Sequence, residues 1–296
     1  MHKKHILITG GTGFLGTALI KHWLIKDYDI TLLTRSANTA TSLFGLSVHV
    51  VEHLDSLPKD SYFDAVVNLA GAPIFAKPWS QARKQLLRDS RIAFTHQLLS
   101  FLSQLHTKPE VLINGSAIGV YADENHSDSV SFSQQLCLDW EQAALQAEKM
   151  HMRVCLLRTG LVLGTGGGLL KNMLPAFKLG LGGQLGNGQQ WMSWIHRDDW
   201  VAIVDELVNH SHWQGAIDAT APNPVTNSEF SRTLAKNLQR PCLVKTPAWI
   251  LKLVLGEMSE LVLASQRIIP SALLDAKFTF KFSDLASALQ DVVGKH

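Results

Sequence analysis

Short β-rich runs alternate with longer helical patterns through the first half of the chain. The predicted strands cover residues 6–9, 30–33, 48–51, 65–69, 111–114 and 154–157. The main predicted helices between them cover residues 14–25, 90–105 and 137–150. Alternation of this kind builds βαβ units, whose parallel strands are covered by helices on both faces. The sequence therefore predicts an α/β fold with a doubly wound, mostly parallel sheet.

A glycine-rich loop joins the first predicted strand to the first predicted helix. Residues 10–16 read Gly-Gly-Thr-Gly-Phe-Leu-Gly, so Gly10, Gly13 and Gly16 recur at intervals of three. Glycines permit the tight turn and let the backbone approach a pyrophosphate, while the helix N-terminus supplies free N–H groups. No Gly-Lys-Ser/Thr follows, which argues against a nucleoside-triphosphate P-loop. The context predicts a Rossmann dinucleotide site, with a merely tight strand–helix turn as the alternative.

The end of the second predicted strand indicates which dinucleotide binds. An NAD-specific site usually places Asp or Glu there to bind the ribose hydroxyls. This chain instead reads Leu33-Thr34-Arg35-Ser36. A guanidinium with no competing acid pairs with a 2′-phosphate through charge-assisted hydrogen bonds. We therefore predict NADP as the cofactor, and the alternative for Arg35 is a solvated surface side chain.

The composition and periodicity of the sequence change after Arg158. Residues 164–188 are rich in glycine, and helical patterns return near 228–238, 249–263 and 284–293. We expect an NADP-binding Rossmann domain over 1–163, to which part of 197–220 returns, and a smaller substrate-binding lobe over 164–296. The apolar segment 249–263 is interrupted by charges and does not resemble a membrane span. It is predicted to be an amphipathic helix buried against the protein, with a subunit interface or a membrane-surface contact as the alternative.

Composition excludes several classes of protein. Hydrophobic residues make up 46% and charged residues 18%, which excludes a disordered chain. The 27 basic and 25 acidic residues give a net charge of +2, so no strong field attracts nucleic acid. Three cysteines make no disulfide framework and the histidines show no metal-ligand spacing, so no metal is predicted. The apolar run near the N-terminus is too short for a signal peptide, and we expect a cytoplasmic protein without an integral membrane segment.

These motifs together resemble the extended short-chain dehydrogenases/reductases. The glycine spacing, Asn68-Leu69-Ala70-Gly71 after the fourth strand, and Ser116 after the fifth carry the resemblance. More narrowly, the chain is similar to an atypical branch labelled "epimerase family protein", over nearly its whole length. The features of that branch are Ser90-Arg91-Ile92, Asp139-Trp140-Glu141, the run 158–164, Gly180-Leu181-Gly182-Gly183, the run 186–199 and a C-terminal segment from Ile269 to Leu289.

The resemblance implies a cofactor role for particular residues. It implies that the loop residues hold the pyrophosphate, that the end of the second strand holds the adenosine ribose phosphate, and that the end of the fourth strand runs beside the adenosine and its linking ribose. Two further contacts are implied, one from the helix after the fourth strand and one, through the backbone, at the nicotinamide end. The residues implied for the pyrophosphate are Gly10, Thr12, Gly13, Phe14, Leu15 and Gly16. Those implied for the ribose phosphate are Thr34 and Arg35, and those implied for the adenosine and its linking ribose are Leu69, Ala70 and Gly71. Arg91 is the contact implied from the helix, and Val162 is the contact implied at the nicotinamide end. The alternatives are core packing for Leu69 and Val162 and a surface position for Arg91.

The family's Tyr-x-x-x-Lys pair is missing. That spacing puts a proton-exchanging tyrosine and its lysine on one helix face. No tyrosine of this chain has a lysine four residues on, and the equivalent positions hold Cys137 and Glu141. A carboxylate raises the pKa of a nearby thiol unless Arg or His reverses the effect. Ser116 and Tyr121 are the catalytic candidates, with loop capping and packing near the substrate mouth as their respective alternatives.

Two classes of function fit these observations. The first is an NADP(H)-binding oxidoreductase or epimerase-like protein acting on a small polar substrate, for which the resemblance implies a nucleotide sugar. The alternative is a non-catalytic NADP(H)-binding redox sensor or regulatory protein, which the missing pair favours. The expected partner is a small molecule and not a nucleic acid, and the sequence leaves a homodimer open. His196 is expected to anchor the junction between the lobes, with a substrate contact as the alternative.

Overall fold

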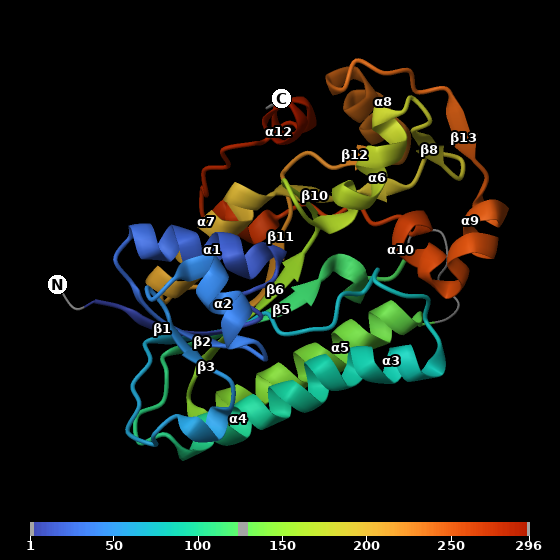
Figure 1. Cartoon of the computed structure of the whole chain (residues 1–296). Coiled ribbons are helices and arrows are strands. Elements are labelled where there is room, and N and C mark those ends of the chain that lie inside the picture. The colour runs from blue at the N-terminus through green and yellow to red at the C-terminus, as the bar shows by residue number, and fades with distance from the viewer. Residues whose placement is uncertain (1–2, 124–129, 295–296) are drawn as a thin grey trace.

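The computed structural model describes residues 3–123 and 130–294, and its centre is a seven-stranded sheet (Figure 1). The strands pair in the order β11-β6-β5-β4-β1-β2-β3, and every pair is parallel. The order reverses between β1 and β4, which is where such sheets form a ligand crevice at their carboxyl ends. This confirms the predicted doubly wound α/β fold. The strands are β1 (His5–Thr9), β2 (Asp29–Leu33), β3 (His49–Val51), β4 (Ala65–Asn68), β5 (Val111–Ala117), β6 (Arg153–Thr159) and β11 (Gly215–Ala219).

Alternate residues of each central strand enter separate cores on the two faces of the sheet. In β1, Ile6 and Ile8 belong to one core and Leu7 to the other. This follows from the two-residue period of a strand, since neighbouring side chains point to opposite faces. Helices α1, α2 and α7 cover the first face, and α4 and α5 cover the second (Figure 1). Both faces are apolar, so the strands read as continuous hydrophobic runs.

Side-chain caps mark the start of several helices of the sheet domain. Helices α3 and α5 begin earlier than predicted because Ser80 and Ser131 accept hydrogen bonds from the backbone N–H of Arg83 and Gln134. Helix α2 lacks a strong apolar pattern, and the sequence does not predict it. The helices of this domain are α1 (Phe14–Ile25), α2 (Ala37–Phe44), α3 (Gln81–Arg88), the π-helical turn η2 (Asp89–Ala93), α4 (Phe94–Gln104), α5 (Phe132–Ala144) and α7 (Arg197–Asn209), with short 3-10 turns at Leu54–Ser56, Ile118–Val120 and Leu145–Met150.

The C-terminal part forms a third core beside the carboxyl ends of the sheet (Figure 1). Trp194, Phe230 and Leu289 lie in it, whereas α7 packs on the main sheet and β11 pairs with β6. The boundary at 163/164 stays a prediction. The remaining elements are the paired strands β7 (Leu161–Leu163) with β10 (Trp194–His196), β9 (Trp191–Met192) with β12 (Val225–Thr226) and β8 (Gly183–Leu185) with β13 (Val244–Thr246), and the helices α6 (Gly168–Lys178), α8 (Asn227–Asn237), α9 (Ala248–Leu255), η5 (Gly256–Ser259), α10 (Glu260–Leu263), α11 (Ser271–Asp275) and α12 (Leu285–Val293).

The expectation of one buried helix over 249–263 is wrong. Gly256 adopts a φ of 57° and ends α9, so the segment is three short pieces. Helix α9 has no buried residue, and the side chains of Trp249 and Leu253 are 66% and 78% exposed. Within the described ranges, no helix combines the length and apolar character of a membrane span.

Candidate cofactor and substrate site

The glycine loop is folded tightly at the carboxyl end of β1. Gly10 has a φ of 68°, and a Cβ there would lie 2.5 Å from the carbonyl oxygen of Leu69. A Cβ at Gly16 would lie 2.5 Å from the carbonyl oxygen of Gly10. Both glycines are therefore required by close backbone approach. Gly13 precedes α1, and among the described residues no side chain caps this helix, so its N-terminal N–H groups stay available to an anion.

The end of β2 presents one uncommitted guanidinium. Arg35 is exposed, and within residues 3–123 and 130–294 its side chain makes no hydrogen bond or ion pair. Thr34 beside it is half-buried, and Ser36 caps α2 by accepting from the N–H of Thr39. One carboxylate is close by, since Glu52 Oε1 accepts from the N–H of Ala37 at 3.1 Å. The end of β2 therefore holds the unpaired guanidinium of Arg35 beside the start of α2.

A buried polar network positions the end of β4 against β1. Asn68 Oδ1 accepts from Thr9 Oγ1 at 2.7 Å, and Asn68 Nδ2 donates to Asn114 Oδ1 at 2.7 Å and to Thr95 Oγ1 at 2.9 Å. Thr9 Oγ1 also accepts from the N–H of Ala70 at 3.2 Å. Fully paired networks of this kind hold a unique geometry. They place Leu69, half-buried against the core, directly over Gly10.

The fold brings Arg91 to Gly71. A Cβ at Gly71 would lie 2.9 Å from Arg91 Cζ, so the two predicted cofactor residues are in contact. Arg91 Nη2 donates to the carbonyl of Ala72 at 3.1 Å, and the guanidinium lies 5.3 Å from the ring of Trp140. Burial lowers the pKa of Arg91 to about 10. The residue sits in the π-helical turn η2, an irregularity frequent at functional sites.

The predicted nicotinamide end lies where β7 meets the glycine-rich turn 164–168. The Val162 side chain is buried in the core, and the expected contact of its backbone with the cofactor stays a prediction. Phe14 packs under this turn, since a Cβ at Gly167 would lie 2.3 Å from its ring. Arg197 lies 5.5 Å above the same ring and donates to the carbonyl of Thr165. Phe14 therefore joins the glycine loop to the second lobe.

Ser116 at the end of β5 is tied to a buried ion pair. Its hydroxyl donates to Glu141 Oε1 at 2.6 Å. Arg158 at the end of β6 donates to both oxygens of Glu141 at 2.9 Å, through Nε and Nη2. The hydrogen bonds to Glu141 are the main reason why the pKa of Arg158 is raised. The guanidinium of Arg158 lies next to Glu141, the position at which the resemblance would put lysine. Arg158 therefore supplies a positive charge there, but from strand β6 and not from helix α5.

Tyr121 extends this arrangement to a second carboxylate. Its hydroxyl accepts from Arg158 Nη1 at 2.9 Å and donates to Asp218 Oδ1 at 2.8 Å. Burial raises the pKa of both Tyr121 and Asp218. Arg158 therefore sits between two carboxylates and two hydroxyl-bearing side chains, which we call the Arg158 cluster: Ser116, Tyr121, Glu141, Arg158 and Asp218.

Cys137 does not replace the missing tyrosine. Its thiol is buried, and burial raises its pKa to about 11. Arg91 and Arg158 lower that pKa and Glu141 raises it, so the expected opposition of charges is present but burial outweighs it. At neutral pH the thiol is therefore protonated and weakly nucleophilic.

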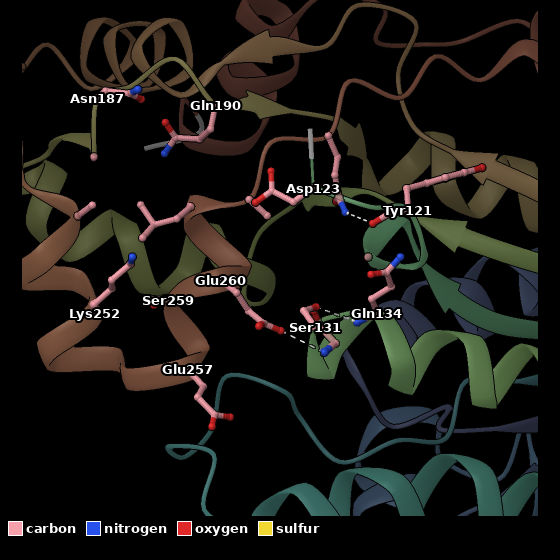
Figure 2. Close-up of a pocket in the computed structure, with 17 residues that line it drawn as sticks. Tyr121, Asp123, Ser131, Gln134, Asn187, Gln190, Lys252, Glu257, Ser259 and Glu260 are labelled. Atoms are coloured by element: carbon pink, nitrogen blue, oxygen red, sulfur yellow. Dashed lines mark hydrogen bonds between the residues drawn. The ribbon is translucent and has the colours of Figure 1, made fainter. Parts of the chain in front are cut away.

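A cavity of about 630 Å³ opens beside the Arg158 cluster, between the sheet domain and the C-terminal helices. Figure 2 shows Asn187 and Gln190 on one side of it and Lys252 and Glu260 on the other. Tyr121 borders the cavity, but its ring points away from these residues, and its carbonyl accepts from Gln266 Nε2 (Figure 2). The volume is in the range of small-molecule sites.

Sequence reasoning missed two members of the Arg158 cluster. Arg158 and Asp218 lie 17 and 97 residues from the partners to which they bond, Glu141 and Tyr121. The only local signal is a charged side chain at the end of an apolar strand, which both share. His196 acts as an anchor, since it is buried, caps α7 by accepting from the N–H of Asp198 and lies 3.9 Å from the ring of Phe282. In the described part of the chain no group of three His, Cys, Asp or Glu side chains is placed to hold a metal ion.

Comparison with known proteins identifies related sequences along nearly the whole chain. The NAD dependent epimerase/dehydratase family matches residues 6–217, and a domain of unknown function, DUF1731, matches residues 246–292. The epimerase family protein SDR39U1 homolog, chloroplastic, of Arabidopsis thaliana is 35% identical over 97% of this chain and 86% of its own length. An epimerase family protein of Staphylococcus saprophyticus is 36% identical over 98% and 99%.

Solved structures agree with the sequence matches. The human epimerase family protein SDR39U1, crystallised with NADPH, superposes with a TM-score of 0.87 and 28% identity over 99% of this chain and 100% of that one. A nucleoside-diphosphate sugar epimerase from Corynebacterium glutamicum gives a TM-score of 0.77 and 27% identity over 99% of this chain and 59% of that chain. The superpositions include the C-terminal lobe as well as the sheet.

Proposed function

The chain belongs to the NAD dependent epimerase/dehydratase family, and we propose that it is an NADP(H)-dependent oxidoreductase or epimerase-like enzyme for a small polar substrate. The observation that carries the proposal is the Arg158 cluster, which connects Ser116 at the carboxyl edge of the sheet to the border of the 630 Å³ cavity. The glycine loop and the cluster lie at the same edge, because all seven strands of the sheet are parallel.

The residues present fit NADP(H). The uncapped start of α1 and the tight glycines at 10 and 16 suit a pyrophosphate, and the free guanidinium of Arg35 suits a 2′-phosphate. That the human relative was crystallised with NADPH supports this choice. When bound, the nicotinamide supplies or accepts hydride; Arg35 and the start of α1 would hold the phosphates.

In this proposal Ser116 holds the reacting oxygen of the substrate. Its own hydrogen is committed to Glu141, so the lone pairs of Oγ are free to accept a hydrogen bond from a substrate hydroxyl. Glu141 is kept in place by two hydrogen bonds from Arg158. Tyr121 acts through Arg158, because its hydroxyl is turned toward Arg158 and Asp218, and it is therefore a positioning residue in this proposal.

The cysteines and the third core bear on location and on domain organisation. The three cysteines are free, which suits a reducing compartment and supports a cytoplasmic protein. After residue 163, the segments other than α7 and β11 pack around a core of their own. This supports their assignment as the substrate-binding lobe. A homodimer stays a prediction.

The cofactor is tested by titrating the purified protein with NADPH and NADH in parallel in a calorimeter. Arg35→Ala should weaken NADPH binding about ten- to a hundredfold, because a charged contact to phosphate contributes roughly 1.5–3 kcal/mol. NADH binding should change little. Equal loss for both dinucleotides would show that Arg35 does not read the 2′-phosphate.

Turnover separates the enzyme from a non-catalytic NADP(H)-binding regulator. The protonated, buried Cys137 in place of the usual tyrosine favours the regulator. A pool of candidate substrates that accelerates NADPH oxidation in the wild type and loses that effect in Ser116→Ala would establish the enzyme. Cofactor binding in both proteins serves as the folding control. Binding without turnover in any pool would favour the regulator.

A further inference from the structure

The exposed face of helix α9 is apolar. Trp249, Leu253 and Val254 are 66–78% exposed, and no residue of α9 is buried. Trp249 and Leu253 are four residues apart, so their side chains lie on the same face of the helix. Large apolar side chains are stabilised by removal from water, and contiguous exposed ones mark interaction surfaces. This face therefore indicates a partner that covers it.

Neighbouring segments extend the apolar face. Leu243 leads into β13, Leu179 and Leu181 follow α6, and all three are 63–83% exposed. The two segments touch, since a Cβ at Gly180 would lie 3.5 Å from Pro241 Cγ. Figure 1 shows β13 and α9 in succession along the right-hand margin of the C-terminal lobe. We call six exposed side chains of these segments the α9 surface: Leu179, Leu181, Leu243, Trp249, Leu253 and Val254.

The charge around this surface has one sign. Residues 230–256 include no Asp or Glu, and their basic side chains, all exposed, are Arg232, Lys236, Arg240, Lys245 and Lys252. In the parts of the chain that the structure describes, Arg240, Lys245 and Lys252 form no ion pair. Glu257, the next acid along the chain, is paired with Lys84. Unbalanced positive charge therefore alternates with the apolar positions.

This charge decides between the possible occupants of the α9 surface. Two copies of the chain that met symmetrically through it would bring positive charges opposite positive charges, which opposes association. A bilayer with anionic lipids attracts lysine and arginine, and it accepts tryptophan and leucine at the boundary between headgroups and acyl chains. The α9 surface and its basic neighbours offer both kinds of group within one stretch of chain.

We propose that the α9 surface docks the protein on a bilayer that contains anionic lipids. Trp249 and Leu253 would enter the headgroup region, while Arg240 and Lys245 would face lipid phosphates. The docking is peripheral, because α9 has 8 residues and a membrane span needs about 20. The cavity lies close to the bilayer in this arrangement, since its lining includes Lys252 of the same helix. This inference goes beyond the proposed function and does not depend on turnover.

The test is flotation of the full-length protein with vesicles of two compositions. One is phosphatidylcholine alone, and the other is phosphatidylcholine mixed with an equal part of phosphatidylglycerol. At low salt we expect the partition coefficient for the mixed vesicles to exceed that for phosphatidylcholine by at least about tenfold. Added salt should weaken the binding by screening the charges. Absence of binding to the mixed vesicles, or equal binding to both, would overturn the proposal.

An apolar substitution tests the role of helix α9. Leu253→Ser removes an aliphatic side chain that would enter the bilayer, and it should weaken binding to the mixed vesicles by about tenfold or more. Ile25→Ser is the matched control, because Ile25 ends helix α1 and is 86% exposed far along the chain from the α9 surface. It should leave binding unchanged, and both variants should bind NADPH like the wild type if they fold. An equal effect of the two substitutions, or no effect of Leu253→Ser, would contradict the assignment.

A charge substitution tests the basic neighbours. Lys245→Gln should weaken binding to the mixed vesicles about fivefold at low salt, and the effect should shrink as salt is added. Lys149→Gln, at an exposed lysine in the turn Leu145–Met150, is the control and should change nothing. If both lysines contribute equally, the attraction comes from net charge and the α9 surface is not the docking site.

A second copy of the chain is the competing occupant, and sedimentation of the protein without lipid tests it. We expect wild type and Leu253→Ser to have the same mass in solution. A dimer that Leu253→Ser dissociates, together with a wild type that does not float with the mixed vesicles, would assign the α9 surface to a second copy and overturn the proposal.

Discussion

The glycine loop and the Arg158 cluster lie at the same edge of one sheet but are built in different ways. The loop is made of backbone from residues close in sequence, and its glycines are required because a Cβ at Gly10 or Gly16 would lie 2.5 Å from a carbonyl oxygen. The cluster is made of side chains whose bonded partners are 17 to 97 residues apart. A local motif can therefore identify a cofactor site, whereas the groups that act on a substrate depend on how distant strand ends meet.

The largest effect should come from breaking the ion pair of the Arg158 cluster. Arg158→Met leaves Glu141, whose side chain is 7% exposed, without its cation. We expect the free energy of unfolding to fall by about 3–5 kcal/mol, measured by urea denaturation. Combining it with Glu141→Gln should recover most of that loss, since the buried charge is then gone. Additive losses in the double variant would show that the two side chains are not coupled.

Gly10→Ala should give the next largest effect and should act on the other region. It combines a left-handed φ, worth about 1–2 kcal/mol, with a clash against the backbone of Leu69, worth about 1–3 kcal/mol. Gly45→Ala is a matched control, because Gly45 has a φ of 60° but nothing lies within 4 Å of the position that a Cβ would take there. NADPH affinity should be lost in Gly10→Ala and kept in Gly45→Ala. Equal destabilisation by both would show that no clash exists.

The smallest expected effect is on the pH dependence of stability. It concerns His196, which belongs neither to the glycine loop nor to the Arg158 cluster. Burial lowers the pKa of His196, although Asp198 and Asp291 oppose this. The folded state therefore prefers the neutral ring. Its stabilising contribution is full above the unfolded-state pKa of about 6.5 and is lost as the pH falls through the lower folded-state pKa.

His196→Asn tests this effect, because asparagine can still cap α7 but does not titrate. We expect urea unfolding between pH 8 and pH 5 to show a shallower loss of stability in the variant. Part of the slope should remain, because burial also lowers the pKa of His5 and His22. An unchanged slope would mean that His196 does not contribute to acid sensitivity, and the variant's behaviour at pH 8 shows whether the cap is intact.

Much of the sheet domain is predictable because its signals are periodic and local. Strand β1 and helix α1 occur where the apolar pattern places them, and helix α1 has the predicted bounds. The start of α3 escapes prediction because its sequence is polar and only a serine cap marks its beginning. The contact between Gly71 and Arg91 was not predicted and comes from the structure, and the binding of NADP(H) by the predicted cofactor residues stays a proposal.

The amino-acid sequence by itself determined the parallel sheet and the glycine loop, because strand periodicity and the freedom of glycine act over a few neighbouring residues. Only the tertiary structure decided that Arg158 pairs with Glu141, that α9 is exposed, and that Gln190 Oε1 is buried without a partner among the residues described. The physical reason is that ion pairs, burial and cavities arise where distant segments meet. Those meetings depend on how the whole chain packs, and no short stretch of sequence records them.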